Sequence, residues 1–472
     1  MQIVSVVFWI FVAAVFFMLW LCNRVVKDLE SKIKYSKIIL LLASYIFITY
    51  ADIKFAIVLA VMSIITWWAA KEEKNMKYGI ILCLLALAYF KYTNFFINSF
   101  EKLLGTSNTA SLKIILPLGI SFYVFSVISY IVDVHKNKLE KHSFWDVALY
   151  LSFFPKLTSG PIQRSKDFFD QISVQRNIGW NSFQQGIQIF TVGLFKKIVL
   201  ADRLSVFVDQ VYATPKAFNS FTVFLAVISY SMQIYFDFSG YSDMAIGIAK
   251  MLGIDLPRNF NLPYLSKNVT ELWKRWHITL SSWLMEYLYF PLGGNRKGKI
   301  RTYVNLVLTM LIGGLWHGAN WTYVFWGFLH GIGLCIHKLW KTRKNTLQDS
   351  SILNLINILI TFLFTSFCWI FFRAESLNQA TSIIKVMCSF QEGIFHPYVW
   401  LFFAFIVYGI AVYFAIKKKD KAGTIVQNNG INGYYPIQNL ESFWGQVIFF
   451  VFVGIIFGLA YTGGSPFIYG AY

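Results

Sequence analysis

The sequence is poor in charged residues. Asp, Glu, Lys and Arg make up only 14% of its 472 residues, whereas soluble domains carry about 25%. A chain with so little charge cannot cover a water-facing surface, which excludes an ordinary soluble enzyme and a disordered protein. Among the charged residues the acidic ones are fewer: the chain has 23 Asp and Glu and 42 Lys and Arg, which gives a net charge of +19. The position of that surplus along the chain has to be known before it is interpreted as nucleic-acid binding.

Cysteine pairs and motifs for metal or nucleotide chemistry are also missing. The five cysteines are scattered and form neither a CxxC pair nor a disulfide framework. Without an HExxH motif or paired Cys ligands we expect no dedicated metal site, and there is no GxSxG nucleophile elbow. The segment 293–300 loosely resembles a phosphate-binding loop, but it lacks the Ser or Thr that would hold magnesium and is interpreted as a turn. Because the aromatics lie in apolar runs, we expect no nucleic-acid partner.

Long apolar runs are what the sequence has in abundance. Hydrophobic residues make up 57% of the chain, and a helix that spans a bilayer needs about 20 mostly apolar residues. The clearest candidates are Ile3–Leu21, Tyr78–Ile97, Ile114–Val134, Phe221–Phe236, Phe325–Leu339, Ile352–Phe372, Val399–Ile416 and Trp444–Tyr461. Shorter or interrupted runs are Ile38–Tyr50, Phe55–Ala70, Phe183–Leu200 and Tyr303–Leu315. These runs predict an all-α polytopic membrane protein with about ten to twelve transmembrane or re-entrant helices, in one domain over residues 1–472.

The basic residues predict the orientation of the chain in the membrane. No positive charge precedes the first run, and no small-residue cleavage site follows it, so it is not a typical signal peptide. Arg24, Lys27 and Lys32 follow it, which predicts a cytoplasmic loop and an extracytoplasmic N-terminus by the positive-inside rule. Later basic clusters also fit the inside, and they place the C-terminal tail outside. The stretch 143–291 does not give a clear count of spans.

A first cluster of polar residues lies in Tyr235–Asp243, at the end of an apolar run. It contains Asp237, Ser239 and Asp243, and polar residues near membrane depth are candidates for function. One interpretation is a polar lining or a helix break that orients a substrate. The alternative is a buried network that satisfies irregular backbone. The residues alone favour the second.

A second cluster lies in 268–283. Asn268 followed by Glu271 resembles the capping box of a helix start. A continuous helix from there would place Trp273, His277 and Ser281 on one face, with Lys274 and Arg275 to the side. A histidine on such a face serves either catalysis or a hydrogen bond at the membrane interface. Its tryptophans, Trp276 among them, are typical of that interface.

A third cluster, Gly313–Trp321, contains the strongest candidate, His317. Glycines on both sides of Trp316 and His317 favour a broken or kinked helix, which would place the imidazole within the membrane. Imidazole titrates near neutrality and can take a proton from a hydroxyl; the alternative is a turn residue at the outer membrane face. On a continuous helix His330 lies about 220° around from His317, so packing is its expected role.

These segments together match a known family. Leu116–Val134, Phe153–Arg164, Tyr235–Asp243, Asn259–Tyr264, Leu272–Trp283 and Leu315–Trp321 resemble the membrane-bound O-acyltransferases. The similarity is greatest to the bacterial branch related to alginate O-acetyltransferase and the peptidoglycan O-acetyltransferase membrane subunit. It covers about residues 116–331, and the motifs are specific only in combination.

The resemblance implies a ring of tilted helices around a thinned centre with a tunnel through the membrane. It implies that His317 is the signature catalytic histidine and His277 the second active-site histidine. The residues expected to line the tunnel or bind substrate are Trp316, Asn320, Asp237, Ser239, Asp243, Lys274, Arg275, Trp276 and Ser281.

The resemblance also implies the reaction and its partners. An acyl group would come from a cytoplasmic thioester, acetyl-CoA or an acyl carrier, with no tightly bound cofactor. The acceptor would be an extracytoplasmic polysaccharide such as peptidoglycan or alginate, reached through an SGNH-type O-acetyltransferase outside a bacterial inner membrane. Lys274, Arg275, Arg296 and Lys297 could attract the anionic donor.

The C-terminal tail, residues 463–472, is the last candidate. It is aromatic and similar to the tail of related proteins, although Gly470 stands where another aromatic is common. Tyr469 either receives the acyl group transiently, docks the partner, or anchors the tail at the interface.

Two other functions compete with polysaccharide O-acetylation. Within the same fold, the alternative is transfer of D-alanine to teichoic acid. From a different class, the alternative is a transporter or exporter of polysaccharide, whose flux would not depend on His317.

Overall fold

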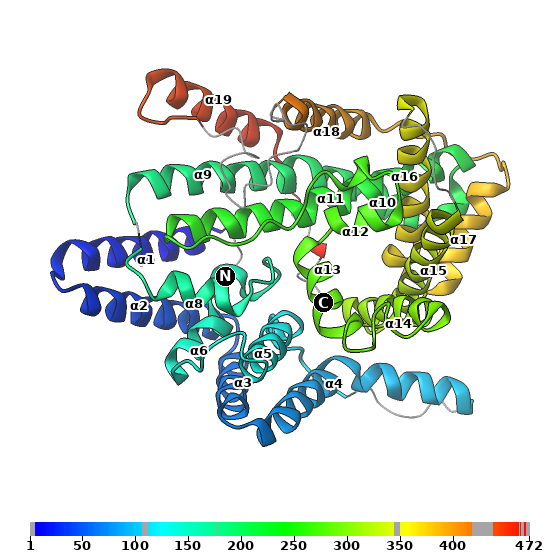
Figure 1. Cartoon of the computed structure of the whole chain (residues 1–472). Coiled ribbons are helices and arrows are strands. Elements are labelled where there is room, and N and C mark those ends of the chain that lie inside the picture. The colour runs from blue at the N-terminus through cyan, green and yellow to red at the C-terminus, as the bar shows by residue number, and fades with distance from the viewer. Residues whose placement is uncertain are drawn as a thin grey trace. The chain divides into compact units, whose positions relative to one another are not determined.

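In a computed structural model, residues 5–105, 112–176, 178–343, 350–417, 438–461, 463 and 467–468 are described. Every regular element in these ranges is a helix, as the all-α class predicted (Figure 1). Polar side chains start several helices. The Asp28 carboxylate accepts a hydrogen bond from the Ser31 N–H at 2.8 Å at the start of α2 (Leu29–Thr49). Such caps satisfy amide groups that have no partner within the helix.

Five helices in the described part of the chain are long and apolar enough to cross a membrane. They are α1 (Val6–Val25), α3 (Ile53–Lys71), α4 (Glu73–Leu104), α11 (Ser220–Met251) and α16 (Ser351–Arg373). Shorter apolar helices are α5 (Ile120–His135), the part Val399–Tyr413 of α18 (Val399–Lys417) and α19 (Phe443–Leu459). The remaining predicted runs are also helical, in α2, α9 (Trp180–Leu194), α14 (Lys299–His317) and α15 (Trp321–Arg343).

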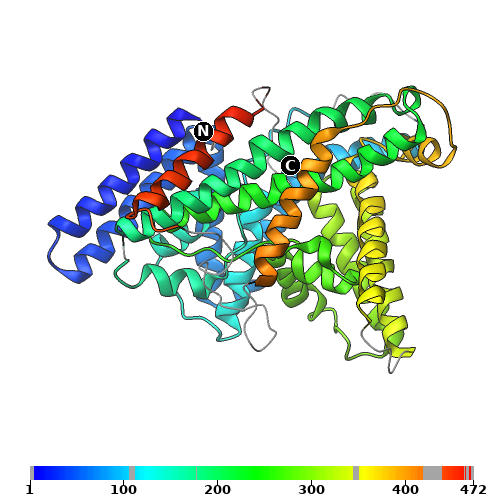
Figure 2. The same ribbon diagram turned by 90° about the horizontal axis from the view of Figure 1, so that it is seen from above.

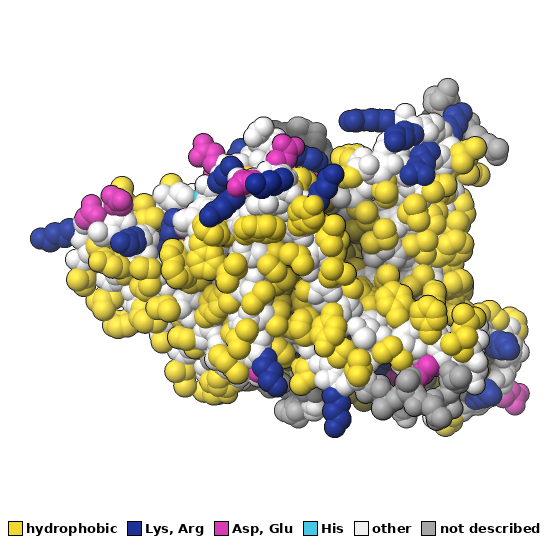
Figure 3. Space-filling model, turned by 90° about the horizontal axis from the view of Figure 1, so that it is seen from below, with side chains coloured by type: hydrophobic (Ala, Val, Ile, Leu, Met, Phe, Trp, Pro, Cys, Tyr) yellow, Lys and Arg dark blue, Asp and Glu magenta, His cyan; other side chains and the backbone are white. Residues whose placement is uncertain are grey.

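The surface of the protein is suited to lipid. Large apolar side chains such as Leu85 on α4 and Ile360 on α16 are exposed by 59% and 60%. Figure 3 shows one face on which hydrophobic side chains cover wide areas, while Lys and Arg side chains gather in clusters. Contact with hydrocarbon removes the cost that such exposure would have in water.

The chain forms two compact units. The first comprises residues 1–190 and 242–257. In it, α1 buries Phe8, Val12, Val15 and Leu19, a spacing of three or four residues that forms one helical face. Helix α3 packs on α4, α5 and α6 (Phe144–Ser152), and the short helices α7 (Phe154–Leu157) and α8 (Ser165–Ile172) follow.

The second unit comprises residues 191–241 and 258–472. It contains α10 (Asp202–Ala213), α12 (Val269–Arg275), α13 (Ile278–Leu284), α14, α15, α16 and α17 (Leu377–Cys388). Its core is aromatic: Trp276, Trp326 and Trp369 are among the largest fully buried side chains. Two π-helices, η1 (Phe195–Ala201) and η4 (Met285–Tyr289), also belong to it.

Helix α11 is continuous over residues 220–251, so the helix break considered for Tyr235–Asp243 is absent from this described helix. Figures 1 and 2 show α11 running alongside α9. The apolar run of α11 continues straight through the polar segment because buried partners satisfy its carboxylates, as described below for Asp237.

Helices α14 and α15 pack unusually closely, and glycine permits it. A Cβ atom at Gly327 would lie 2.2 Å from the Met310 carbonyl oxygen, and one at Gly314 would lie 2.3 Å from the Tyr323 carbonyl oxygen. These obstacles are backbone atoms, which cannot rotate away. Gly313 and Gly314 therefore lie inside α14, where Gly314 lets α15 come close, and the helix ends only at His317.

We expect Gly327→Ala to destabilise the protein by about 1–3 kcal/mol, because the added methyl forces the two helices apart. The thermal unfolding midpoint of the detergent-solubilised protein measures this. Gly454→Ala in α19 is the matched control, since nothing lies within 4 Å of its added Cβ; alanine in a helix should leave stability unchanged or raise it by about 0.5–1 kcal/mol. Equal midpoints for Gly327→Ala and the wild type would contradict the packing argument.

Candidate active site

His317 is the last residue of α14, and it is 3% exposed. Aromatic rings surround its imidazole: the centroid of Trp326 lies 5.0 Å away and that of Phe372 5.3 Å away, both roughly perpendicular to it. The chain then leaves the helix in an extended conformation at Gly318. The imidazole therefore stands at a helix end, inside an apolar wall that holds its orientation.

Asn320 stabilises the turn after His317. Its Oδ1 accepts a hydrogen bond from the Thr322 N–H at 3.1 Å at the start of α15, and its Nδ2 donates to the Glu375 carbonyl at 2.9 Å. The amide was expected to line a tunnel, and here it ties the site to α15 and to the segment after α16.

His277 lies between two helices, which corrects the prediction of one continuous helix. Helix α12 ends at Arg275 and α13 begins at Ile278, with His277 at φ 41° and ψ 56°. Trp273, His277 and Ser281 therefore do not share a single helical face. The left-handed conformation is costly for a residue with a Cβ and occurs mainly where surrounding contacts impose it, often at functional sites.

Asn259 supplies those contacts. Its backbone carbonyl accepts a hydrogen bond from the Ile278 N–H at 2.9 Å. Its side-chain oxygen accepts from the Thr279 hydroxyl at 2.9 Å and lies 3.0 Å from His277 Nδ1. Because this oxygen can only accept, His277 Nδ1 carries the proton and donates it, which leaves the lone pair on Nε2.

His277 is uncharged at neutral pH. Its side chain is fully buried, and burial lowers the pKa of the imidazole to about 3 from its ordinary 6.5. A neutral imidazole with Nδ1–H held by Asn259 presents an acceptor nitrogen.

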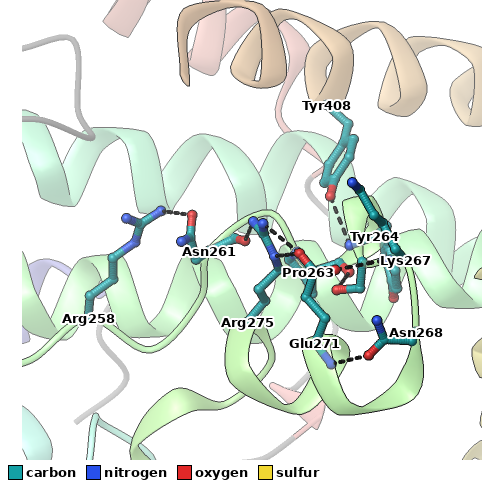
Figure 4. Close-up of polar contacts among 10 residues, drawn as sticks. Arg258, Asn261, Pro263, Tyr264, Lys267, Asn268, Glu271, Arg275 and Tyr408 are labelled. Carbon is teal, nitrogen blue, oxygen red and sulfur yellow. Dashed lines mark hydrogen bonds and ion pairs between the residues drawn. The ribbon is translucent and has the colours of Figure 1, made fainter. Parts of the chain in front are cut away.

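The segment before His277 is tied down by charged hydrogen bonds (Figure 4). Asn268 starts α12 by accepting from the Glu271 N–H at 2.8 Å, as predicted. Glu271 in turn forms an ion pair of 2.8 Å with Arg275. Arg275 also donates to the Asn261 carbonyl at 3.2 Å, and Arg258 donates to the Asn261 side chain at 2.9 Å. Arg275 and its neighbours thus hold α12 against the segment that carries Asn259.

The ring of Trp316 lies near the rings of both histidines. Its ring centroid lies 4.8 Å from that of His317 and 6.4 Å from that of His277. Phe238 of α11 also packs against His277, with the ring centroids 4.7 Å apart and the two rings nearly perpendicular. Two predicted segments that are about 40 residues apart, one with His277 and one with Trp316 and His317, therefore meet at one place in the second unit.

Asp237 belongs to a buried charge network, the role that the residues alone favoured for its segment, although the partners could not be identified from the sequence. Lys197 of η1 lies between two carboxylates, with its Nζ 2.7 Å from Asp237 and 2.7 Å from Asp202. The second oxygen of Asp237 accepts the Ile468 N–H at 2.8 Å. All three charged side chains are almost fully buried. In this network the negative charge of Asp237 is paired with Lys197. The hydrogen bond from Ile468 also fixes the last described residue of the chain to α11.

The other predicted site residues are distributed more widely. Trp276 is buried against Trp369, with ring centroids 4.9 Å apart, and Ser281 donates to the Trp276 carbonyl at 3.2 Å. Lys274 is exposed, and Ser239 is buried in α11. Asp243 is buried in the first unit, and Tyr469 lies outside the described residues.

Two further expectations concerned His330 and metal binding. His330 is buried among aromatic rings, with centroids of Trp326 and Trp273 at 4.9 and 5.2 Å, in keeping with the packing role expected for it. Within the described ranges, no three His, Cys, Asp or Glu side chains gather as a metal site would require.

Asn259 and Lys197 contact predicted site residues, and neither was predicted from the sequence. Asn259 begins the matched segment Asn259–Tyr264, and its position there was the available signal. Lys197 lies in a run that resembled an ordinary membrane helix, and nothing local marks its pairing with Asp237.

Comparison with known proteins extends over most of the chain. The family model of the membrane-bound O-acyltransferases matches residues 54–376, which include His277, His317 and Asn259. The probable alginate O-acetylase of Pseudomonas aeruginosa is 39% identical over 372 residues, 76% of this chain and 70% of that protein. The corresponding protein of Azotobacter vinelandii is 34% identical over 482 residues, 93% of this chain and 95% of its own length.

Two further relatives differ in the polymer that their names specify. The peptidoglycan O-acetyltransferase of Helicobacter pylori is 38% identical over 392 residues, 75% of this chain and 74% of that protein. The teichoic acid D-alanyltransferase of Streptococcus thermophilus is more distant, at 31% over 245 residues, 49% of this chain and 59% of that protein. Matches of this extent and strength, with the spanning helices, make the chain a multi-pass membrane protein and an acyltransferase of the membrane-bound O-acyltransferase family.

Proposed function

We propose that the protein moves an acetyl group from a cytoplasmic thioester to the hydroxyls of an extracytoplasmic polysaccharide. The observation that carries the proposal is that the rings of His277 and His317 both lie near the ring of Trp316, in a family of acyltransferases. The similar alginate and peptidoglycan enzymes support a polysaccharide acceptor and an acetyl group.

The chemistry requires few catalytic groups, because a thioester is already activated. A ring nitrogen of His317 would take the proton of the acceptor hydroxyl as its oxygen attacks the thioester carbonyl carbon. The carbon–sulfur bond then breaks, and the thiolate leaves with the electron pair and takes up a proton. The products are an ester and a free thiol.

His277 has a role compatible with its hydrogen bond. With Nδ1–H donated to Asn259, its Nε2 can accept but cannot donate. The two roles expected for His277 were orienting the acceptor and stabilising the intermediate. Acceptance by Nε2 favours the first, since an acceptor hydroxyl would donate to it, whereas an oxyanion would need a donor.

The donor and the partners follow from the same proposal. The donor would be acetyl-CoA or an acyl-carrier thioester, with no tightly bound cofactor, and the exposed Lys274 would attract its negative charge. The protein would lie in the bacterial inner membrane with both termini outside. An SGNH-type O-acetyltransferase there would complete transfer to the polysaccharide.

Tyr469 would act on that outer side. As a relay, its phenolic oxygen would form an ester with the acyl group as the thiolate leaves, and would later pass the group on. Tyr469→Phe then abolishes polysaccharide acetylation. If the ring only anchors the tail or docks the partner, the Tyr469→Phe protein supports normal polysaccharide acetylation, while the Tyr469→Ala protein does not.

The two competing functions can be separated from acetyl transfer. D-alanyl transfer is favoured only by the more distant relative, and membranes supplied with a D-alanyl carrier thioester would measure it directly. A transporter would show polysaccharide flux that survives loss of His317.

We expect His317→Ala to lower acyl transfer by at least about 100-fold, because it removes the general base. The measurement is transfer of labelled acetyl from acetyl-CoA to polysaccharide in membranes that also contain the partner enzyme. His396→Ala, which changes a partly exposed histidine in a loop, is the matched control and should retain activity. Full activity of a membrane-inserted His317→Ala protein would refute the assignment.

We also expect His277 to make stability depend on pH. The unfolded chain binds a proton on this imidazole below about pH 6.5, and the folded chain does so only near pH 3. Stability therefore falls as the pH decreases from 7.5 to 5, by about 2 kcal/mol from this group. His277→Gln, which has no titrating ring, should show a smaller decrease in the unfolding midpoint over that range. An identical decrease in both proteins would contradict the buried neutral imidazole.

A further inference from the structure

A second polar site lies in the first unit, at the end of α1. An open cavity of about 330 Å³ is lined by Trp20, Asn23, Arg24, Gln175, Arg176 and Ile178. Three of these residues come from the last turns of α1 and three from the segment between α8 and α9. The Asn23 amide donates to the Arg176 carbonyl at 3.3 Å, which joins the two sides. None of these residues belongs to the candidate active site.

Arg176 is the unusual member of this group. It is only 7% exposed, and its Nη1 is buried without a hydrogen-bond acceptor. No carboxylate among the described residues forms an ion pair with it. Burial lowers the pKa of the guanidinium to about 10, so the group stays charged at neutral pH. A buried cation is costly unless an anion pairs with it, so this arginine indicates an anionic ligand.

Arg24 places a second cation at the same cavity. Its guanidinium carbon lies 5.2 Å from the centre of the Trp20 ring, a cation–π contact that orients it. It too has no carboxylate partner within the described ranges. Two guanidinium groups with the amides of Asn23 and Gln175 offer many hydrogen-bond donors in one place. Phosphate oxygens match that donor set, because guanidinium binds them in pairs.

The surroundings of the cavity identify the source of the phosphate. The outer face of α1 is exposed and apolar beside it, with Phe17 57%, Leu21 43% and Val25 66% exposed. Val174, on the other side of the cavity, is 58% exposed. Trp20 is a residue typical of the membrane interface, and the basic residues that follow α1 predict that this end lies at the cytoplasmic surface. Acyl chains can lie along α1 while a headgroup reaches the arginines.

We propose that this cavity binds the phosphate of an anionic phospholipid, with Arg176 and Arg24 as its two cationic ligands. The site is independent of acyl transfer, and its occupant is a structural lipid. Its effect would be to neutralise a buried charge and to tie α1 to the segment before α9. A free phosphate compound shares this chemistry but makes no use of the apolar face of α1.

The test is lipid binding to the full chain in detergent, followed by native mass spectrometry. Phosphatidylglycerol should be retained in preference to phosphatidylcholine, whose choline cation the arginines repel. Arg24→Gln and Arg176→Gln should each weaken phosphatidylglycerol binding by about tenfold, the loss of one charge-assisted contact. Arg301→Gln removes an equal charge from an exposed position on α14 and should change nothing.

Several outcomes would overturn the proposal. One is unchanged phosphatidylglycerol binding in Arg24→Gln, which alters an exposed side chain and so should fold even if Arg176→Gln does not. Another is equal retention of the two lipids by the wild type. A third is displacement of phosphatidylglycerol by millimolar inorganic phosphate in the wild type but not in Arg24→Gln, which would assign the cavity to a soluble phosphate compound.

Discussion

The site depends on one acceptor, the side-chain oxygen of Asn259. It receives the Thr279 hydroxyl and the His277 Nδ1–H, while the backbone carbonyl of the same residue receives the Ile278 amide. These bonds hold the chain in a left-handed turn that interrupts what would otherwise be one helix. They also decide which ring nitrogen of His277 carries the proton and which is left as a hydrogen-bond acceptor. Asn259 therefore determines the backbone conformation, the tautomer and the ring orientation of His277, which is fully buried.

Much of the fold could be predicted because lipid imposes a simple rule on sequence. Apolar runs become helices, and the runs at Ile352–Phe372 and Phe55–Ala70 correspond closely to α16 and α3. The capping pair Asn268 and Glu271 also marked the true start of α12. The break at His277 could not be predicted, since the residues around it suit a helix and only tertiary contacts from Asn259 oppose one. Likewise, α11 remains a helix through Tyr235–Asp243 because Lys197, distant in sequence, pairs with Asp237.

Buried cations follow two different patterns in this chain. Lys197 has two carboxylates within 2.7 Å, so its charge is balanced by the protein itself. Arg176 has none among the described residues, although it is nearly as buried. For Lys197, the two carboxylates offset the cost of burying its charge within the fold. The second pattern has no such balance among the described residues, and the anion proposed for the cavity beside Arg176 would supply it.

The π-helical turns of η1 have a consequence for the length of this part of the chain. The Asp202 N–H bonds to the carbonyl of Lys197, five residues earlier, so the segment contains a wider turn than an α-helix. Loss of one residue here would restore α-helical spacing and rotate the preceding side chains by about 100° relative to those that follow. Lys197 could then no longer face both Asp202 and Asp237. The pairing of Lys197 with two carboxylates therefore constrains the number of residues in this stretch.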